Sequence, residues 1–308
     1  MMMLSHHLNA QTFPDRTVKI IAPNPPGGPN DMVARLIGQR LSELWGEPVI
    51  IENKAGAGGN IGTTFVAKSK PDGYTLLINT STIAANMRLS LNPGYDLERD
   101  FVGISNIGAT PNIILTNLNS QIKSIKDLAN NPKFQKINYG SPGIGSTAHL
   151  SLDYFFKTNG NNDAIHIGYK GAGPALTALM GGEIEIASTA MPPAIAFVKG
   201  DKLTALAVTG SKRSSILPNV PTLSEQGIQG MDLYTWIGLF APKETPDSVV
   251  RKIRSDMDKV LSQKDILEKL KSSGFETENE SIADFSKTIS KEMVYWQKVL
   301  TATGTKPQ

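Results

Sequence analysis

Three glycine-rich loops in this chain have the residue types that hold an anion. They are Pro26-Gly27-Gly28, residues 56–62 and residues 140–147, and each lies between an apolar run and a predicted helix. Glycines let the backbone approach a ligand closely, and the following helix presents unpaired N–H groups and the positive end of its dipole. The pattern predicts a carboxylate or phosphate ligand, although glycines in any single loop could serve only to make a turn.

Polar side chains near these loops extend the candidate site. Asp31 could cap its helix, hold a bridging water or be an ordinary first-turn acid, since a bare carboxylate would repel an anionic ligand. His149 either donates to the ligand or is a half-buried structural histidine. Hydroxyl groups that could contact the ligand, cap a helix or do both belong to Ser81, Ser141, Ser146 and Thr147.

Other chemistries lack the residues they need. Gly56-x-Gly58-x-x-x-Gly62 has one residue too many for a dinucleotide loop, and the sequence has no Walker loop, no G-x-S-x-G nucleophile elbow and no cysteine. His149 and His166 are too far apart for a local metal motif. We therefore expect no enzyme, no metal and no cofactor. The 31 basic and 28 acidic residues are scattered, which argues against nucleic-acid binding.

Alternating strands and helices must position these loops. Apolar or β-branched runs predict strands, and stretches with one apolar face predict helices. The predicted strands are residues 18–22, 48–52, 74–78, 112–116, 137–139, 164–169, 184–188, 203–208 and 236–242; the predicted helices include residues 31–45, 63–68, 148–156, 174–180 and most of the chain from 246 onward. This order is typical of an α/β fold with doubly wound, parallel sheets.

A chain of 308 residues exceeds what one compact core usually organises, so we expect two lobes. The first comprises residues 12–115 and 236–308, whose C-terminal helices pack back on it, and the second comprises residues 116–235. The chain would cross between lobes near Thr116 and Trp236, with the ligand in the cleft between them. Residues 1–11 are interpreted as disordered, or as the remnant of a signal peptide or of a non-native leader.

Several motifs together resemble the Bug family of periplasmic solute receptors, which serve tripartite tricarboxylate transporters. The resemblance runs nearly from end to end. It rests on Phe13-Pro14-Asp15-Arg16, Pro25-Pro26-Gly27-Gly28 with Asp31, Glu52-Asn53 before residues 56–62, Pro71-Asp72-Gly73-Tyr74, Gly143-x-Gly145-Ser146 with His149-Leu150, Tyr169-Lys170-Gly171, residues 217–222 and residues 236–242.

The resemblance implies a two-lobed periplasmic binding protein fold of class II type, with the ligand cleft between the lobes. It implies that Pro26-Gly27-Gly28 and residues 141–147 hold a ligand carboxylate, partly through waters. The implied partners are a small organic carboxylate, such as a di- or tricarboxylate or an aromatic acid, and a membrane permease; we expect a monomer. The candidate ligand-binding residues are Asn24, Pro26, Gly27, Gly28, Asp31, Ser81, Ser141, Gly145, Ser146, Thr147, His149, Tyr169, Ser188 and Thr189.

Two departures from the family pattern bear on the ligand. Asn24 stands where an aromatic residue is usual, and Ser188-Thr189 stand where an acid that could pair with a ligand amine is common. We therefore expect a rather polar pocket without a strong preference for amino acids. Two alternative functions stay open: a binding module that reports to a membrane sensor, and an α/β transferase or hydrolase acting on a phosphorylated substrate, for which no cleft base is evident.

Overall fold

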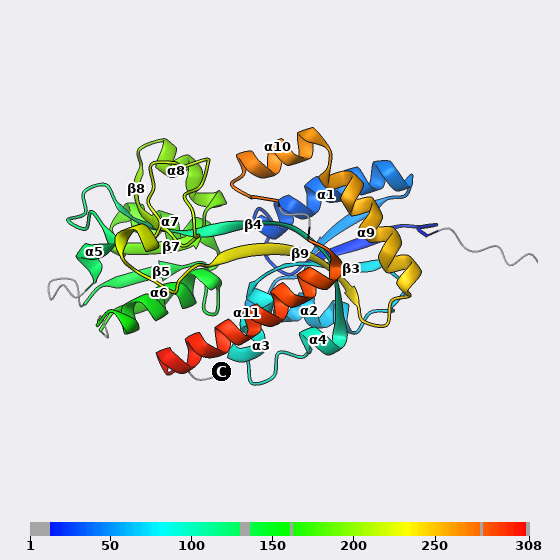
Figure 1. Cartoon of the computed structure of the whole chain (residues 1–308), viewed down its shortest axis with the longest axis horizontal. Coiled ribbons are helices and arrows are strands. Elements are labelled where there is room, and N and C mark those ends of the chain that lie inside the picture. The colour runs from blue at the N-terminus through cyan, green and yellow to red at the C-terminus, as the bar shows by residue number, and fades with distance from the viewer. Residues whose placement is uncertain (1–12, 130–135, 161–162, 278–279, 306–308) are drawn as a thin grey trace, which may run out of the picture.

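Figure 1 shows the computed structural model, which describes residues 13–129, 136–160, 163–277 and 280–305 and has a mixed α/β fold with two lobes. Its elements are β1 (Val18–Ala22), α1 (Pro29–Trp45), β2 (Val49–Asn53), α2 (Asn60–Ala67), β3 (Thr75–Thr80), α3 (Thr82–Leu89), α4 (Leu97–Asp100), β4 (Phe101–Asn117), α5 (Ile125–Leu128), β5 (Asn138–Ser141), α6 (Thr147–Thr158), β6 (Ile165–Gly168), α7 (Ala172–Gly181), β7 (Ile186–Ala190), α8 (Ile195–Lys199), β8 (Leu203–Val208), β9 (Tyr234–Pro242), α9 (Asp247–Leu261), α10 (Lys264–Ser272) and α11 (Ile282–Thr303). Short 3₁₀ helices occupy Ala57–Gly59, Pro192–Ala194 and Ser224–Gln226.

The first lobe is built on a sheet with the strand order β2-β1-β3-β9-β4. Strands β1, β2 and β3 are parallel, and β9 is antiparallel to both β3 and β4. The side chains of β1 alternate between two buried layers, since Ile20 packs with the residues of α1 and Ile21 packs with Val66 of α2. Helices α1 and α2 therefore cover opposite faces of this sheet.

Strand β4 belongs to both lobes. It pairs with β9 up to Pro111, with β7 from Asn112 onward and with β8 from Ile113 onward. Only the second part of this 17-residue strand was predicted, because two glycines interrupt its first part. Packing requires both glycines: a Cβ atom at Gly103 would lie 2.9 Å from the ring of Phe285, and one at Gly108 would lie 3.0 Å from a backbone carbonyl oxygen.

The second lobe repeats the α/β pattern around strands β7-β5-β6. These three strands are parallel, and β4 joins them as an antiparallel neighbour of β7. One face of the sheet packs on α6 through Leu152 and Phe155, and the other packs on α7 through Leu176 and Leu179. Strands β4 and β9 are the long ribbons that join the two lobes in Figure 1.

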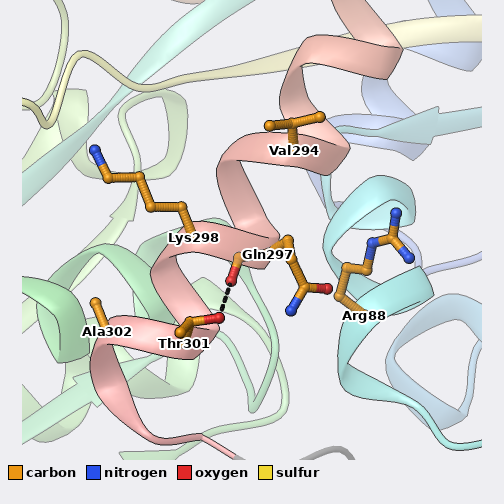
Figure 2. Close-up of a pocket in the computed structure, with 6 residues that line it drawn as sticks. All are labelled: Arg88, Val294, Gln297, Lys298, Thr301 and Ala302. Carbon is orange, nitrogen blue, oxygen red and sulfur yellow. Dashed lines mark hydrogen bonds between the residues drawn. The ribbon is translucent and has the colours of Figure 1, made fainter.

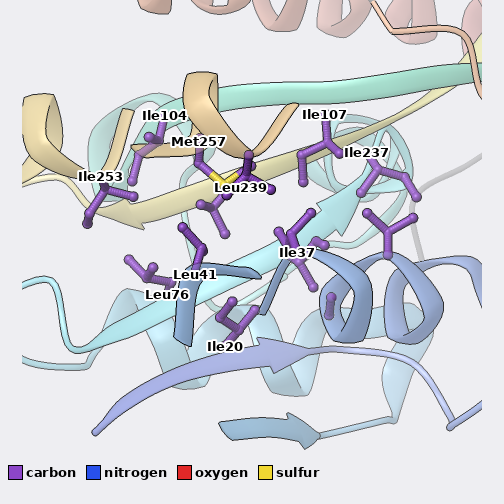
Figure 3. Packing of buried hydrophobic residues seen from close by; sticks show 14 of the residues in the cluster. Ile20, Ile37, Leu41, Leu76, Ile104, Ile107, Ile237, Leu239, Ile253 and Met257 are labelled. Atoms are coloured by element: carbon purple, nitrogen blue, oxygen red, sulfur yellow. The ribbon is translucent and has the colours of Figure 1, made fainter. Parts of the chain in front are cut away.

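The C-terminal helices contact both lobes. Helix α9 packs on α1, and Figure 3 shows Ile253 and Met257 of α9 in the same buried cluster as Ile37 and Leu41 of α1. Helix α11 packs on α3 and β4 and also on α6 of the second lobe. It lies across the front of the molecule in Figure 1, so it is positioned to respond to any change in the relative orientation of the lobes.

Candidate functional site

The candidate loops lie beyond the carboxyl ends of the parallel strands. In the first lobe, the loop after β1 and the turn after β3 flank the point where the strand order reverses. In the second lobe, the loops after β5 and β7 flank the corresponding point. Ligands of doubly wound sheets bind at such points because the neighbouring loops diverge toward opposite faces. The fold thus offers one candidate binding surface in each lobe.

The first loop is held by an ion pair. Gly27, at φ 82°, donates its N–H to Asp31 Oδ2 over 3.0 Å, and Arg35 donates to the same carboxylate over 3.1 Å and lies 2.9 Å from Oδ1. Burial alone would raise the pKa of Asp31, but the hydrogen bonds from Arg35 and Gly27 outweigh it and keep this pKa below its ordinary value. Asp31 is therefore an ionised, balanced acid that shapes the loop.

The start of α1 carries backbone donors that have no partner within the described residues. Its N-cap, Gly28, provides no side-chain cap, and the first hydrogen bond of the helix runs from Met32 N to Gly28 O over 3.0 Å. The amides of Asn30 and Asp31 come earlier in the helix, where no intrahelical carbonyl is available to accept from them. The Asn24 side chain accepts a hydrogen bond from Asn30 Nδ2. The polar residue at position 24 thus braces the helix that carries the free amides.

Residues 56–62 pack against the first loop. A Cβ atom at Gly62 would lie 2.7 Å from the carbonyl oxygen of Lys54 and 2.9 Å from Cβ of Pro23, so only glycine fits there. The carbonyl oxygen of Gly58 accepts a 2.9 Å hydrogen bond from Nδ2 of Asn86, on α3. Close packing thus accounts for the glycine at position 62, and Asn86 anchors the loop to α3.

The third loop folds back on its own serines. Ser141, at the end of β5, accepts from the N–H of Gly143 over 3.2 Å, and Ser146 donates to the carbonyl oxygen of Gly143 over 2.8 Å. Ser146 also caps α6 by accepting from the N–H of His149 over 3.2 Å. Within the described residues, the amides of Thr147 and Ala148 in the first turn of α6 make no hydrogen bond. This turn is a second set of free donors.

Two histidines lie directly beneath the third loop. The rings of His149 and His166 stack with centroids 3.7 Å apart. Nδ1 of His149 accepts from the N–H of Gly145 over 3.2 Å, and Nε2 of His166 lies 2.8 Å from Oγ of Ser141. Burial lowers the pKa of His149 to about 4 and that of His166 to about 3, so both are neutral at neutral pH. They support the loop by hydrogen bonding without adding charge.

These histidines are too distant in sequence for a local motif, and His166 was not among the predicted site residues. They meet because β5 and β6 are neighbours and α6 packs over them. In the described part of the chain, no group of three or more His, Cys, Asp or Glu side chains could hold a metal ion.

The remaining candidates of the second lobe differ in their surroundings. Ser188 and Thr189 are buried on β7, and Oγ of Ser188 makes no hydrogen bond within the described residues. Thr147 directs its hydroxyl toward the strands that join the lobes, as discussed below. The ring of Tyr169 lies against Gly140 and belongs to the apolar layer under α7. Because successive residues of β5 face opposite sides, this ring is on the face opposite Ser141.

Ser81, in the first lobe, is buried at the start of α3, and its N–H donates to the carbonyl oxygen of Trp236 over 3.0 Å. The indole of Trp236 donates to the carboxyl group of Glu292 on α11, and Trp296 donates to the same group over 3.1 Å. Burial raises the pKa of Glu292 to about 8, and the two indole hydrogen bonds only partly oppose this rise. A buried, titratable carboxyl thus lies behind one candidate ligand residue.

The lobes touch where the third loop meets α3. A Cβ atom at Gly145, whose φ is 81°, would lie 3.0 Å from Cδ1 of Leu89 and 3.3 Å from Oδ1 of Asn86. Asn86 in turn anchors residues 56–62, and Gly59 and Gly62 of that segment lie against Pro23 of the first loop. The three loops predicted from the sequence are therefore linked through direct contacts.

A surface groove of about 520 Å³ lies outside this network, between α3 and α11. It is lined by Arg88, Val294, Gln297, Lys298, Thr301 and Ala302 (Figure 2). Asn86 and Arg88 are two residues apart on α3, so the groove lies behind the helix that contacts Gly145. None of the candidate ligand residues lines it.

The fold and the paired helix N-termini define a class, the two-lobed periplasmic solute-binding receptors. The chain belongs to the tripartite tricarboxylate transporter family of receptors, TctC, whose family model matches residues 33–305. Protein BugT of Bordetella pertussis is 33% identical over 304 residues, covering 97% of this chain and 93% of BugT. The family and the fold class predicted from the sequence are confirmed.

Two solved structures are similar over nearly their whole length. R. palustris Rpa4515 with adipate has a TM-score of 0.90 and 32% sequence identity, covering 96% of this chain and 100% of that chain. MatC from Rhodopseudomonas palustris with bound malate has a TM-score of 0.86 and 29% identity, covering 94% of this chain and 100% of that chain. Among the residues described here, no helix is both long and apolar enough to cross a membrane.

Proposed function

We propose that this protein closes its two lobes around a small organic carboxylate, held by amides at the starts of α1 and α6. The observation that carries this proposal is a pair of helix first turns, one in each lobe, whose leading amides make no hydrogen bond within the described residues: Asn30 and Asp31 in α1, and Thr147 and Ala148 in α6. Each hydrogen bond to a charged group contributes about 1.5–3 kcal/mol. Four such amides suffice to hold a carboxylate without an arginine.

Closure follows from the division of donors between the lobes. A ligand that contacts only one lobe gains nothing when the lobes approach, whereas a carboxylate bonded to both favours the closed form by its contacts with the second lobe. We place the first lobe at residues 12–115 and 236–308 and the second at residues 116–235. The change of pairing partner after Pro111 of β4 supports a crossover slightly before the predicted boundary.

A C4–C6 dicarboxylate is the ligand that we favour. The two similar structures described above hold adipate and malate. Ser188 offers a buried hydroxyl without a partner in the described residues, which suits a second carboxylate. Asp31 is the only acid among the candidate residues, and Arg35 already balances it. A ligand ammonium group would find no free acid among them, so the site favours malate over aspartate.

Calorimetric titration of matched ligands tests this function. Malate is compared with aspartate, and adipate with hexanoate, which lacks the second carboxylate. We expect malate to bind more tightly than aspartate, and Ser188→Ala to weaken adipate binding while leaving hexanoate binding unchanged. A thermal-shift screen adds nucleotides and sugar phosphates; a ligand at a hundredfold over its Kd contributes about 2.7 kcal/mol. A shift with phosphates and none with carboxylates would contradict the proposal.

We also infer that the protein is not an enzyme. Ser141 lies beside a histidine ring, that of His166, but burial lowers the pKa of His166 to about 3, which makes it a poor base. The Ser141 hydroxyl is also engaged with both the N–H and the carbonyl oxygen of Gly143. This pair supports the loop and has none of the properties of an activated nucleophile.

Family membership supports delivery of the ligand to a membrane permease. We propose that the protein is a monomer in the periplasm and that its closed form docks on the permease. Sedimentation with and without adipate or malate tests the monomer, and fractionation of cells tests the compartment. A stable dimer, or cytoplasmic recovery of the native protein, would refute the corresponding part.

A further inference from the structure

A buried polar cluster joins the first turn of α6 to the strands that link the lobes. Oγ1 of Thr147 lies 2.7 Å from Oγ1 of Thr235 on β9 and 3.3 Å from Nδ2 of Asn112 on β4. Thr235 also donates to Oδ1 of Asn112 over 3.1 Å. These three side chains are at most 5% exposed. We call them the hinge triad.

The hinge triad lies where the chain passes between the lobes. Asn112 is the first residue of β4 that pairs with β7, immediately after the last pair with β9. Thr209 extends the cluster: its hydroxyl accepts from the N–H of Asn112 over 3.0 Å and donates to the carbonyl oxygen of Leu233 over 2.6 Å, just before β9. Both linking strands are thereby fastened to each other and to α6.

This arrangement differs from an ordinary helix cap. Ser146 already caps α6, so the Thr147 side chain is free to point away from the helix toward the linking strands. Breaking the triad would leave buried donors and acceptors unpaired, which is costly. A rotation of the lobes must therefore either carry α6 with the linking strands or disrupt the triad.

We propose that Asn112 and Thr235 are positioning residues that hold the first turn of α6 on the hinge and so direct its free amides at the ligand. Their role in binding rests on the function proposed above. Their hold on α6 does not, because it is a property of the ligand-free protein. Neither residue was a candidate from sequence, since Asn112, Thr147 and Thr235 are distant along the chain.

Isosteric variants separate this role from general packing. Thr235→Val removes both hydrogen bonds while keeping the shape, and Thr235→Ser keeps the hydroxyl. Thr110→Val is the matched control, because Thr110 pairs with Thr235 across the two strands and is fully buried, yet its hydroxyl has no hydrogen-bond partner among the described residues.

Hydrogen exchange of the ligand-free protein gives the decisive measurement. The amides of His149 and Leu150, bonded to Ser146, report on the first turn of α6, and the amide of Met32 in α1 is the internal reference. We expect Thr235→Val to speed exchange in α6 about tenfold without affecting α1, and Thr235→Ser and Thr110→Val to stay within about twofold of the wild type. Unchanged exchange in Thr235→Val, or an equal change in Thr110→Val, would overturn the proposal.

Binding then tests the link to function. The Kd of Thr235→Val for adipate or malate should rise about tenfold relative to the wild type, with Thr235→Ser nearly normal. If the wild type binds no carboxylate, the proposed function fails, and the exchange data still decide whether the triad holds α6. Equal affinities of the wild type and Thr235→Val would refute the positioning role while leaving the receptor function intact.

Discussion

Replacing Glu292 with glutamine should abolish a loss of stability that the wild type undergoes as pH rises from about 6.5 to about 8. The carboxyl group of Glu292 lies between Trp236 and Trp296, and burial raises its pKa from 4.5 to about 8. The folded protein therefore keeps this proton over a pH range in which the unfolded chain has lost it. The contribution of Glu292 to stability is fully present below pH 4.5 and is lost as pH rises from there to about 8.

The size of the effect follows from the same pKa. A rise from 4.5 to about 8 corresponds to an upper limit of about 5 kcal/mol. The histidines titrate below about pH 6.5 in the unfolded chain and act in the opposite direction, so they obscure the lower part of this range. From pH 6.5 to 9 Glu292 dominates, and the free energy of unfolding of the wild type should fall by about 2 kcal/mol.

Urea unfolding followed by far-ultraviolet circular dichroism at several pH values measures this slope. Indole fluorescence of the native protein provides a second signal, because Trp236 and Trp296 donate to the titrating group. Glu292→Gln should be less stable than the wild type at pH 6.5, because its amide NH₂ group replaces one of the two oxygens that accept from the indoles. Its free energy of unfolding should then stay constant up to pH 9. Glu225→Gln is the control, as Arg213 lowers the pKa of that exposed acid. A flat wild-type profile, or an unchanged slope in Glu292→Gln, would refute this reasoning.

Three further substitutions test other contacts. Gly145→Ala should lower the free energy of unfolding by about 1 kcal/mol because of its positive φ, and it should also weaken carboxylate binding by displacing α3. Gly182→Ala, at φ 76° with no atom within 4 Å of the added Cβ, should lower stability alone. Equal carboxylate affinities of the two variants would contradict the contact between the lobes. Asp256→Asn should lower the free energy of unfolding by about 2 kcal/mol, because buried Asp256 accepts from an indole and two lysines. Asp247 is exposed, so Asp247→Asn should change the free energy of unfolding little in the same urea titration. Burial lowers the pKa of His166 to about 3, so the stability that neutral His166 provides above about pH 6.5 is lost as pH falls toward 3. Between pH 6 and 4, the free energy of unfolding of His166→Gln should therefore fall by roughly 1 kcal/mol less per pH unit than that of the wild type. Parallel profiles would contradict this.

The strand–loop–helix units could be predicted because they depend on local sequence. Short apolar runs that end in glycine or proline mark the strands of each lobe, and the loop ends agree closely with the structure. Two of the motifs that carried the family resemblance prove to be structural. Arg16 pairs with Asp72 over 3.1 Å and lies over the ring of Tyr74, which Phe13 also contacts. They meet at the amino ends of β1 and β3, opposite the candidate site.

The supporting contacts could not be predicted, because they join residues that are distant in sequence. His166 reaches Ser141 only because β6 pairs with β5, and Glu292 reaches Trp236 only because α11 returns across the first lobe. The sequence shows the polar residue in each case, but nothing in its neighbourhood distinguishes it from an exposed one. The long strand β4 was partly missed for a related reason, since its glycines serve distant side chains.

The two lobes hold their free amides by different means, and the difference bears on what the site can select. In the first lobe, Asp31 and Arg35 form a balanced ion pair that fixes the loop before α1. In the second lobe, the neutral rings of His149 and His166 fix the loop before α6 by hydrogen bonds. None of these four residues offers a free cation to a ligand, so under the proposed function attraction would come from amide dipoles at short range. Because such dipoles act strongly only on an anion that lies close to both helices, we expect the shape of the ligand and the placement of its carboxylates to determine selection more than its net charge.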